Sequence, residues 1–215
     1  MTGRARRLAA VLVLAVAAAG VWSSRATWLQ AMAETLVCKP GDGTADAVLI
    51  DNVDPNYLLF EAAQRLRTRG HGTVVIVPVL RSPWDEEPIS VRRGMAELMC
   101  KVAGIAPCDT FETIVKEPIS LHLAFDAANA LEARGAHSVL LVTSGFRSKR
   151  SLEVYGAVLG PRGIAINCQP VFGGQDTSNW FDTGHGVEKV VLQLLKLWYY
   201  RIGVLPRAAD AVSTR

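Results

Sequence analysis

Two arginines, Arg147 and Arg150, stand three residues apart just after an apolar run, Val139 to Val142. A continuous apolar run of this kind is typical of a parallel strand that is covered on both faces. A short polar turn follows, and then a helical pattern, so both arginines are expected in the first turn of a helix. Cations there oppose the helix dipole unless an anion lies between them and the free backbone N–H groups. The pattern therefore predicts a site for a phosphate-like anion.

The spacing of the two arginines supports one shared ligand. Helix residues three apart lie on one face, and the guanidinium fork matches the oxygens of a phosphate. We therefore expect Arg147→Ala to weaken anion binding by about ten- to a hundred-fold with little change in stability. The alternative is an arginine pair that is solvated and binds nothing.

Acid–base candidates follow other expected strand ends. Glu117 and His122 come after a short expected strand, Phe111–Val115, and His185 stands between two glycines. Histidine titrates near neutral pH, and flanking glycines let the backbone approach a ligand closely. Glu117, His122 and His185 are therefore the catalytic candidates. The alternatives are a lone histidine without a partner at His122 and a plain helix-start turn at His185.

Several other kinds of chemistry are not indicated. The turn Thr143–Gly145 lacks the preceding glycine of a hydrolase nucleophile elbow, and the chain has no Walker loop and no G-x-G-x-x-G motif. The four cysteines fit no zinc pattern. We expect no cofactor and no metal.

Length and charge narrow the class of protein. A chain of 215 residues suits one domain. The formal charge of +3 is misleading, because four of the 23 basic residues lie in the first 25 positions and the other 19 face 20 acidic residues. Because the basic and acidic residues nearly cancel, the domain has no strong positive potential to attract nucleic acid. We therefore do not expect the protein to bind nucleic acid.

The N-terminus has the features of a membrane-targeting segment. Three arginines precede an uncharged stretch, Leu8 to Ser24, whose length is close to the minimum for a transmembrane helix. We expect an anchor in residues 1–28 rather than a cleaved signal peptide, although both readings stay open. The arginines would remain cytoplasmic, which places the domain outside the membrane. Residues 29–44 are expected to form a linker, 45–204 the domain and 205–215 a tail.

An oxidising compartment makes the four cysteines disulfide candidates. Four cysteines allow three pairings, and buried free thiols are the alternative. We favour Cys38 with Cys168, because one precedes the first expected strand and the other lies in the last.

Strands and helices are expected to alternate along the domain. The expected strands cover residues 47–50, 73–77, 111–115, 139–142 and 164–171, and the expected helices cover 54–69, 89–103, 119–134, the segment after Arg147, and 187–201. Asp54 and Pro55 are expected to start the first of these helices, and the loop 81–88 with Trp84 to form a rim. The closing helix is apolar almost all round, so we expect it in the core, the alternative being a membrane-surface element. The alternation predicts an α/β fold with a mainly parallel five-stranded sheet covered on both faces, and ligands at the carboxyl ends of the strands.

From about residue 45 to residue 201 the chain resembles the YdcF-like domain family. The resemblance is carried by the segments Ala45–Val48, Glu117 with Ser120, Val142–Ser144 followed by Arg150, a Trp-containing loop, and Lys196–Tyr200. It implies a Rossmann-like three-layer fold and, as in the bacterial envelope members, a single N-terminal anchor and a role in cell-wall or surface-glycan biogenesis. The chain departs from the family pattern at His122, Arg147 and Gln193.

Two hypotheses follow for a bacterial envelope protein whose domain lies on the periplasmic or extracellular side. One is an enzyme that acts on a phosphorylated or lipid-linked small molecule. The other is a non-catalytic factor that binds a lipid carrier or a partner protein. The departures from the family pattern favour the second hypothesis, and the polar residues clustered at the strand ends favour the first. The expected ligand-binding residues are Asp51, Asn52, Ser120, Thr143, Ser144, Arg147 and Arg150.

Overall fold

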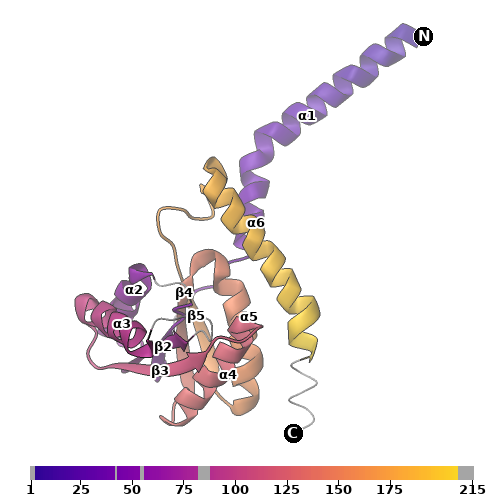
Figure 1. The fold of residues 1–215 in the computed structure, drawn as a ribbon. Coiled ribbons are helices and arrows are strands. Elements are labelled where there is room, and N and C mark those ends of the chain that lie inside the picture. Colours follow the sequence, from indigo (N-terminus) through magenta and orange to yellow (C-terminus); the bar gives the residue numbers. More distant parts are fainter. Residues whose placement is uncertain (1–2, 42, 54–55, 82–87, 208–215) are drawn as a thin grey trace.

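The fold was obtained as a computed structural model, which describes residues 3–41, 43–53, 56–81 and 88–207 (Figure 1). A single five-stranded sheet has the order β3-β2-β1-β4-β5, and every strand pairing is parallel. The strands are β1 (Ala47–Ile50), β2 (Val74–Arg81), β3 (Cys108–Ile114), β4 (Ser138–Ser144) and β5 (Ala165–Val171). The predicted parallel α/β sheet is confirmed, and its strand order is Rossmann-like.

Six α-helices accompany the sheet within the described residues. They are α1 (Gly3–Glu34), α2 (Tyr57–Thr68), α3 (Ile89–Ala103), α4 (Ile119–Glu132), α5 (Ser148–Leu159) and α6 (Gly184–Tyr199). Short turns of other helix types precede α5 at Gly145–Arg147 and follow α6 at Tyr200–Val204. Helices α2 and α3 lie on one side of the sheet, and α4 and α5 lie on the other (Figure 1).

The short strand β1 shows why both faces of the sheet need a cover. Its four side chains are all buried and point alternately to opposite faces. Val48 and Ile50 join the core under α2 and α3, whereas Ala47 and Leu49 join the core under α4 and α5. A strand that is buried on both faces reads as a continuous apolar run, which is why β1 and β4 were predictable.

The start of α2 differs from the expectation. The capping residue is Asn56, whose side chain accepts a hydrogen bond of 3.0 Å from the Leu58 N–H. An asparagine in an extended conformation satisfies one of the N–H groups at a helix start. Asp54 and Pro55, expected in this role, lie outside the described residues, as does most of the loop with Trp84.

Helix α1 leads into the domain instead of ending before a linker. It continues to Glu34, and Ala33 and Leu36 are buried against Trp180 and the inner face of α6. The indole of Trp180 also donates a hydrogen bond of 3.3 Å to the Leu29 carbonyl. The first part of the expected linker is thus packed structure, while the rest of α1 extends away from the sheet (Figure 1). None of the helices in the described part of the chain has the length and hydropathy needed to cross a bilayer.

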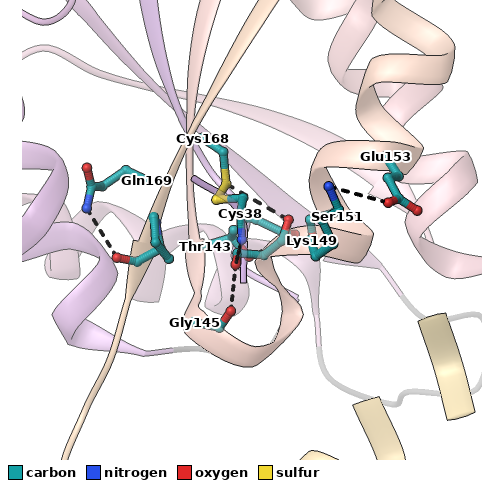
Figure 2. The surroundings of a disulfide bond; sticks show 11 residues. Cys38, Thr143, Gly145, Lys149, Ser151, Glu153, Cys168 and Gln169 are labelled. Carbon is teal, nitrogen blue, oxygen red and sulfur yellow. Dashed lines mark hydrogen bonds and ion pairs between the residues drawn. A yellow bond between two sulfur atoms is a disulfide. The ribbon is translucent and has the colours of Figure 1, made fainter. Parts of the chain in front are cut away.

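The cysteines form two pairs. Cys38 and Cys168 have their sulfur atoms 2.11 Å apart, which is the expected pairing, and Cys100 pairs with Cys108 at 1.99 Å. Figure 2 shows the first pair beside the start of α5. There the Cys38 N–H donates to the Ser148 hydroxyl at 2.9 Å. This bridge ties the end of the α1 segment to β5 and to the start of α5.

Helix α6 is not a core helix, contrary to the expectation. Its buried residues are only Gly186, Val190 and Leu197. Large apolar side chains on its outer face are exposed: Val187, Val191, Leu192, Leu195, Trp198 and Tyr199. The inner face packs on the end of α1 and on Phe146, and no described element covers the outer face.

Candidate functional site

The site lies where the strand order reverses. Strands β2 and β3 continue from β1 to one side, and β4 and β5 lie on the other, so β1 and β4 are neighbours whose connections diverge. Ligands of open α/β sheets bind outside the carboxyl ends of the strands at such a point. Asp51 follows β1 directly, and Ser144 ends β4. Two of the predicted ligand-binding residues, Asp51 and Ser144, therefore lie at this edge of the sheet.

Arg147 and Asp51 form a buried ion pair at this edge. One guanidinium nitrogen of Arg147 lies 2.8 Å from the Asp51 carboxylate and donates a bond of 2.9 Å to the Asp51 carbonyl. The same carboxylate accepts hydrogen bonds from Thr143 at 2.9 Å and from Ser151 at 2.7 Å. Burial alone raises the pKa of Asp51, but the charge of Arg147 and these hydrogen bonds outweigh it, so the pKa lies below its usual value. Asp51 is thus a carboxylate that holds Arg147 in place.

Arg150 is buried one turn further along and has a different set of neighbours. It donates 2.7 Å to the Ser120 hydroxyl and 3.4 Å to the side-chain oxygen of Gln193. Its guanidinium lies 5.1 Å from the ring centre of Tyr200, and the Tyr200 hydroxyl accepts a bond of 3.1 Å from the Ser120 N–H. Arg150 therefore connects α5 to the start of α4 and to α6.

Two cavities flank these arginines. One, of about 240 Å³, lies between Asp51 and α6 and includes Ser144, Arg147 and Lys189 in its lining. The other, of about 340 Å³, will be called the basic cavity. Its lining is Val53, Glu117, Ile119, Ser120, Arg147, Arg150, Gln193, Lys196, Tyr199 and Tyr200. Three cations and one carboxylate line the basic cavity, and because Asp51 neutralises Arg147, the remaining charges of Arg150, Lys196 and Glu117 give a net charge of +1.

Two of the backbone donors expected to assist the arginines already have partners within the protein. The Lys149 N–H donates 2.9 Å to the Leu36 carbonyl, and the Ser148 N–H donates to the Gly145 carbonyl. The segment that enters from α1 covers the start of α5, which the sequence pattern did not reveal. An anion in the basic cavity would therefore be bound by side chains rather than by this helix start.

The remaining ligand-binding predictions divide by burial. Ser120 and Ser144 line the cavities, but Thr143 is fully buried in its bond to Asp51. Asn52 is also buried, and it lines a separate apolar cavity beside α3. Thr143 is therefore a support for Asp51 rather than a ligand contact, and Asn52 lines a different cavity from Arg147 and Arg150.

The structure does not bring the three catalytic candidates together. Glu117 is exposed at the rim of the basic cavity. His122 faces another cavity, with Glu112 and Asp126. His185 is exposed at the start of α6 and lines neither the basic cavity nor its neighbour. The described lining of the basic cavity thus contains no histidine.

Helix α6 supplies cavity-lining side chains that the sequence analysis did not select as site residues. Lys189, Gln193 and Lys196 line the cavities, and they are spaced at three and four residues along the helix. Positions with this spacing share one helix face, which is the signal that could have identified them. Nothing in the sequence indicated that this face would meet the carboxyl edge of the sheet.

Comparisons with known proteins give little further information. No protein-family model and no curated protein matches the sequence. The fold is similar to that of a protein from the universal stress protein family from Burkholderia pseudomallei, at 15% sequence identity over 61% of this chain and 100% of that chain, with a TM-score of 0.36. That likeness is too distant to bear on function, and the resemblance to the YdcF-like family remains a sequence-based expectation.

Proposed function

We propose that the protein is an anion-binding protein that holds a phosphate-like group in the basic cavity at the carboxyl edge of the sheet. The observation that supports this most is the convergence of Arg147, Arg150 and Lys196 on one cavity at the β1–β4 reversal. Because a guanidinium and a phosphate form charge-assisted hydrogen bonds, Arg150 is the main expected ligand contact. Lys196 is exposed and contributes as a mobile point charge at the rim.

Binding is proposed in preference to catalysis. An enzyme that acts on a phosphate needs an acid–base group within hydrogen-bond reach of the reacting atoms. His122 and His185 lie away from the basic cavity, and Glu117 stands at its exposed rim. The non-catalytic alternative therefore has more support than the enzyme hypothesis.

We also propose that the protein works in the bacterial envelope, outside the cytoplasm and attached through its N-terminal segment. The two cysteine pairs support this, since disulfides persist in oxidising compartments. The role in cell-wall or surface-glycan biogenesis is part of the same proposal and rests on the sequence resemblance.

Calorimetric titration of the purified protein with inorganic phosphate tests the binding proposal. Arg150→Gln is expected to weaken binding by about ten- to a hundred-fold, and Lys196→Gln by about two- to fivefold because its charge is screened by solvent. The matched control is Lys101→Gln, which removes an exposed lysine on α3 and should leave the affinity unchanged. Equal phosphate affinity in all four proteins, each checked to be folded, would contradict the proposal.

A further inference from the structure

We propose that the ligand is a lipid phosphate, whose anionic head occupies the basic cavity and whose apolar chain lies in an adjoining groove between α4 and the end of α6. This inference rests on the proposed function, because the head needs the basic cavity. Among the ligands that the sequence analysis left open, it selects an amphiphile rather than a free phosphate or a sugar phosphate.

The adjoining groove is apolar and of ligand size. It has a volume of about 410 Å³ and is lined by Glu117, Pro118, Leu121, Phe125, Tyr199, Gly203, Val204 and Arg207. Leu121 and Phe125 lie one turn apart on α4 and are partly buried on its inner side, where they pack against the core. Cavities of roughly 300–1,000 Å³ with mainly apolar linings are typical of small-molecule sites. The groove can therefore take a hydrocarbon chain.

The groove adjoins the basic cavity. Glu117 and Tyr199 line both of them. One ligand can thus place its charge near Arg150 and Lys196 while its chain extends past Tyr199 along α4. Arg150 and Lys196 attract the anionic part to the basic cavity, whereas the described lining of the groove has one cation, Arg207, and is otherwise mainly apolar. The carboxylate of Glu117 disfavours a second negative charge at the junction.

The far side of Tyr199 supports an apolar chain as well. Val187, Val191, Leu195, Trp198 and Ile202 are exposed at intervals of three or four residues, and they form an apolar stripe along the outer face of α6 and the helical turn that follows it. Tyr199 stands beside this stripe and is itself exposed. A chain longer than the groove would emerge next to apolar side chains instead of into bulk water, which lowers the cost of binding a long lipid.

Three soluble probes separate the head from the chain: inorganic phosphate, octyl phosphate and octanol, each titrated into the full chain below its aggregation concentration. Each methylene that leaves water tightens binding by about fourfold. Octyl phosphate should therefore bind at least about tenfold more tightly than phosphate even if only part of its chain enters the groove. Octanol should bind weakly, because it lacks the anionic head.

A groove variant then locates the chain. Leu121→Gln is expected to lower the affinity for octyl phosphate by about tenfold while leaving the affinity for inorganic phosphate unchanged. Phe125→Leu, at a second position that lines the groove but not the basic cavity, should have the same selective effect on a smaller scale and serves if Leu121→Gln does not fold. Leu98→Gln, which replaces an exposed leucine on α3, is the matched control and should change neither affinity.

The outcomes distinguish this inference from the function on which it rests. If octyl phosphate binds no more tightly than phosphate, the lipid inference is overturned and anion binding stands. If octyl phosphate binds more tightly but neither groove variant alters it, the chain binds elsewhere and the groove is wrongly assigned. If neither phosphate nor octyl phosphate binds, the proposed function itself fails, and the inference fails with it.

Discussion

At the scale of single residues, the two arginines turn out to have different roles. The spacing of Arg147 and Arg150 predicted that both would bind an anion, and it did not reveal their protein partners. Asp51 stands almost a hundred residues before Arg147, so no local pattern links them. The ion pair makes Arg147 first a structural residue, whereas Arg150 is bonded to the neutral side chains Ser120 and Gln193 in the basic cavity.

The expectation that Arg147→Ala hardly changes stability must therefore be revised. The substitution leaves the Asp51 carboxylate buried without its cation, which typically costs about 3–5 kcal/mol. Urea unfolding should show this loss. The double variant Asp51→Asn/Arg147→Ala should be less destabilised than the sum of its single substitutions, because no buried charge remains. Strict additivity would mean that the two side chains are not energetically coupled.

The same pair predicts how stability depends on pH. The pKa of Asp51 is lowered in the folded protein, so between the folded value and the unfolded value near 3.9 the unfolded chain binds more protons. The stabilisation is complete above about pH 4 and is lost as the pH falls through the folded pKa. Urea unfolding between pH 7 and pH 2 should show a steeper acid decline for the natural protein than for Asp51→Asn. Parallel curves would show that Asp51 is not the group responsible.

At the scale of the elements, the sequence predicted those that are marked by local signals. The bounds of α3 agree with the expectation, and the buried strands β1 and β4 were evident as apolar runs. Helix α6 was misassigned because an apolar composition does not tell which faces find a partner. The inner face of the helix packs against the end of α1, Trp180 and the turn at Phe146, whereas its outer stripe stays exposed. The contact between the segment after α1 and the start of α5 was also not predictable, because it joins residues that are 110 positions apart in the sequence.

The Cys38–Cys168 bridge is expected to stabilise this contact. It closes a loop with a sequence separation of 130 residues, compared with 8 for Cys100–Cys108. In the chain-entropy account, loss of the long loop costs roughly 5 kcal/mol and loss of the short one roughly half as much. Unfolding of the two double cysteine-to-serine variants measures the difference. A larger effect from the short bridge would contradict this account.

At the scale of the whole molecule, the sequence predicted a parallel α/β sheet with its site at the carboxyl edge, and the structure agrees on the sheet. It did not predict the composition of the basic cavity, because Lys196, Gln193 and Tyr200 come from a helix at the other end of the chain. Such convergence depends on how the elements pack, which spacing along the sequence does not encode.

The proposed location is also a property of the whole chain. A reporter fused after Arg215 that is active only outside the cytoplasm should give a signal, because the N-terminal arginines are expected to stay inside. A cytoplasm-only reporter at the same position serves as the control and should be silent. Activity of the cytoplasmic reporter alone would contradict an envelope location.

The most direct measurement of the central claim is a crystal structure of the protein grown with methyl phosphate, refined independently of any assumed site. The account predicts an anion in the basic cavity, within hydrogen-bond distance of the Arg150 guanidinium and near the Lys196 ammonium, with the Arg147–Asp51 pair intact behind it. An anion bound elsewhere, with the basic cavity holding only water at a saturating concentration, would contradict it.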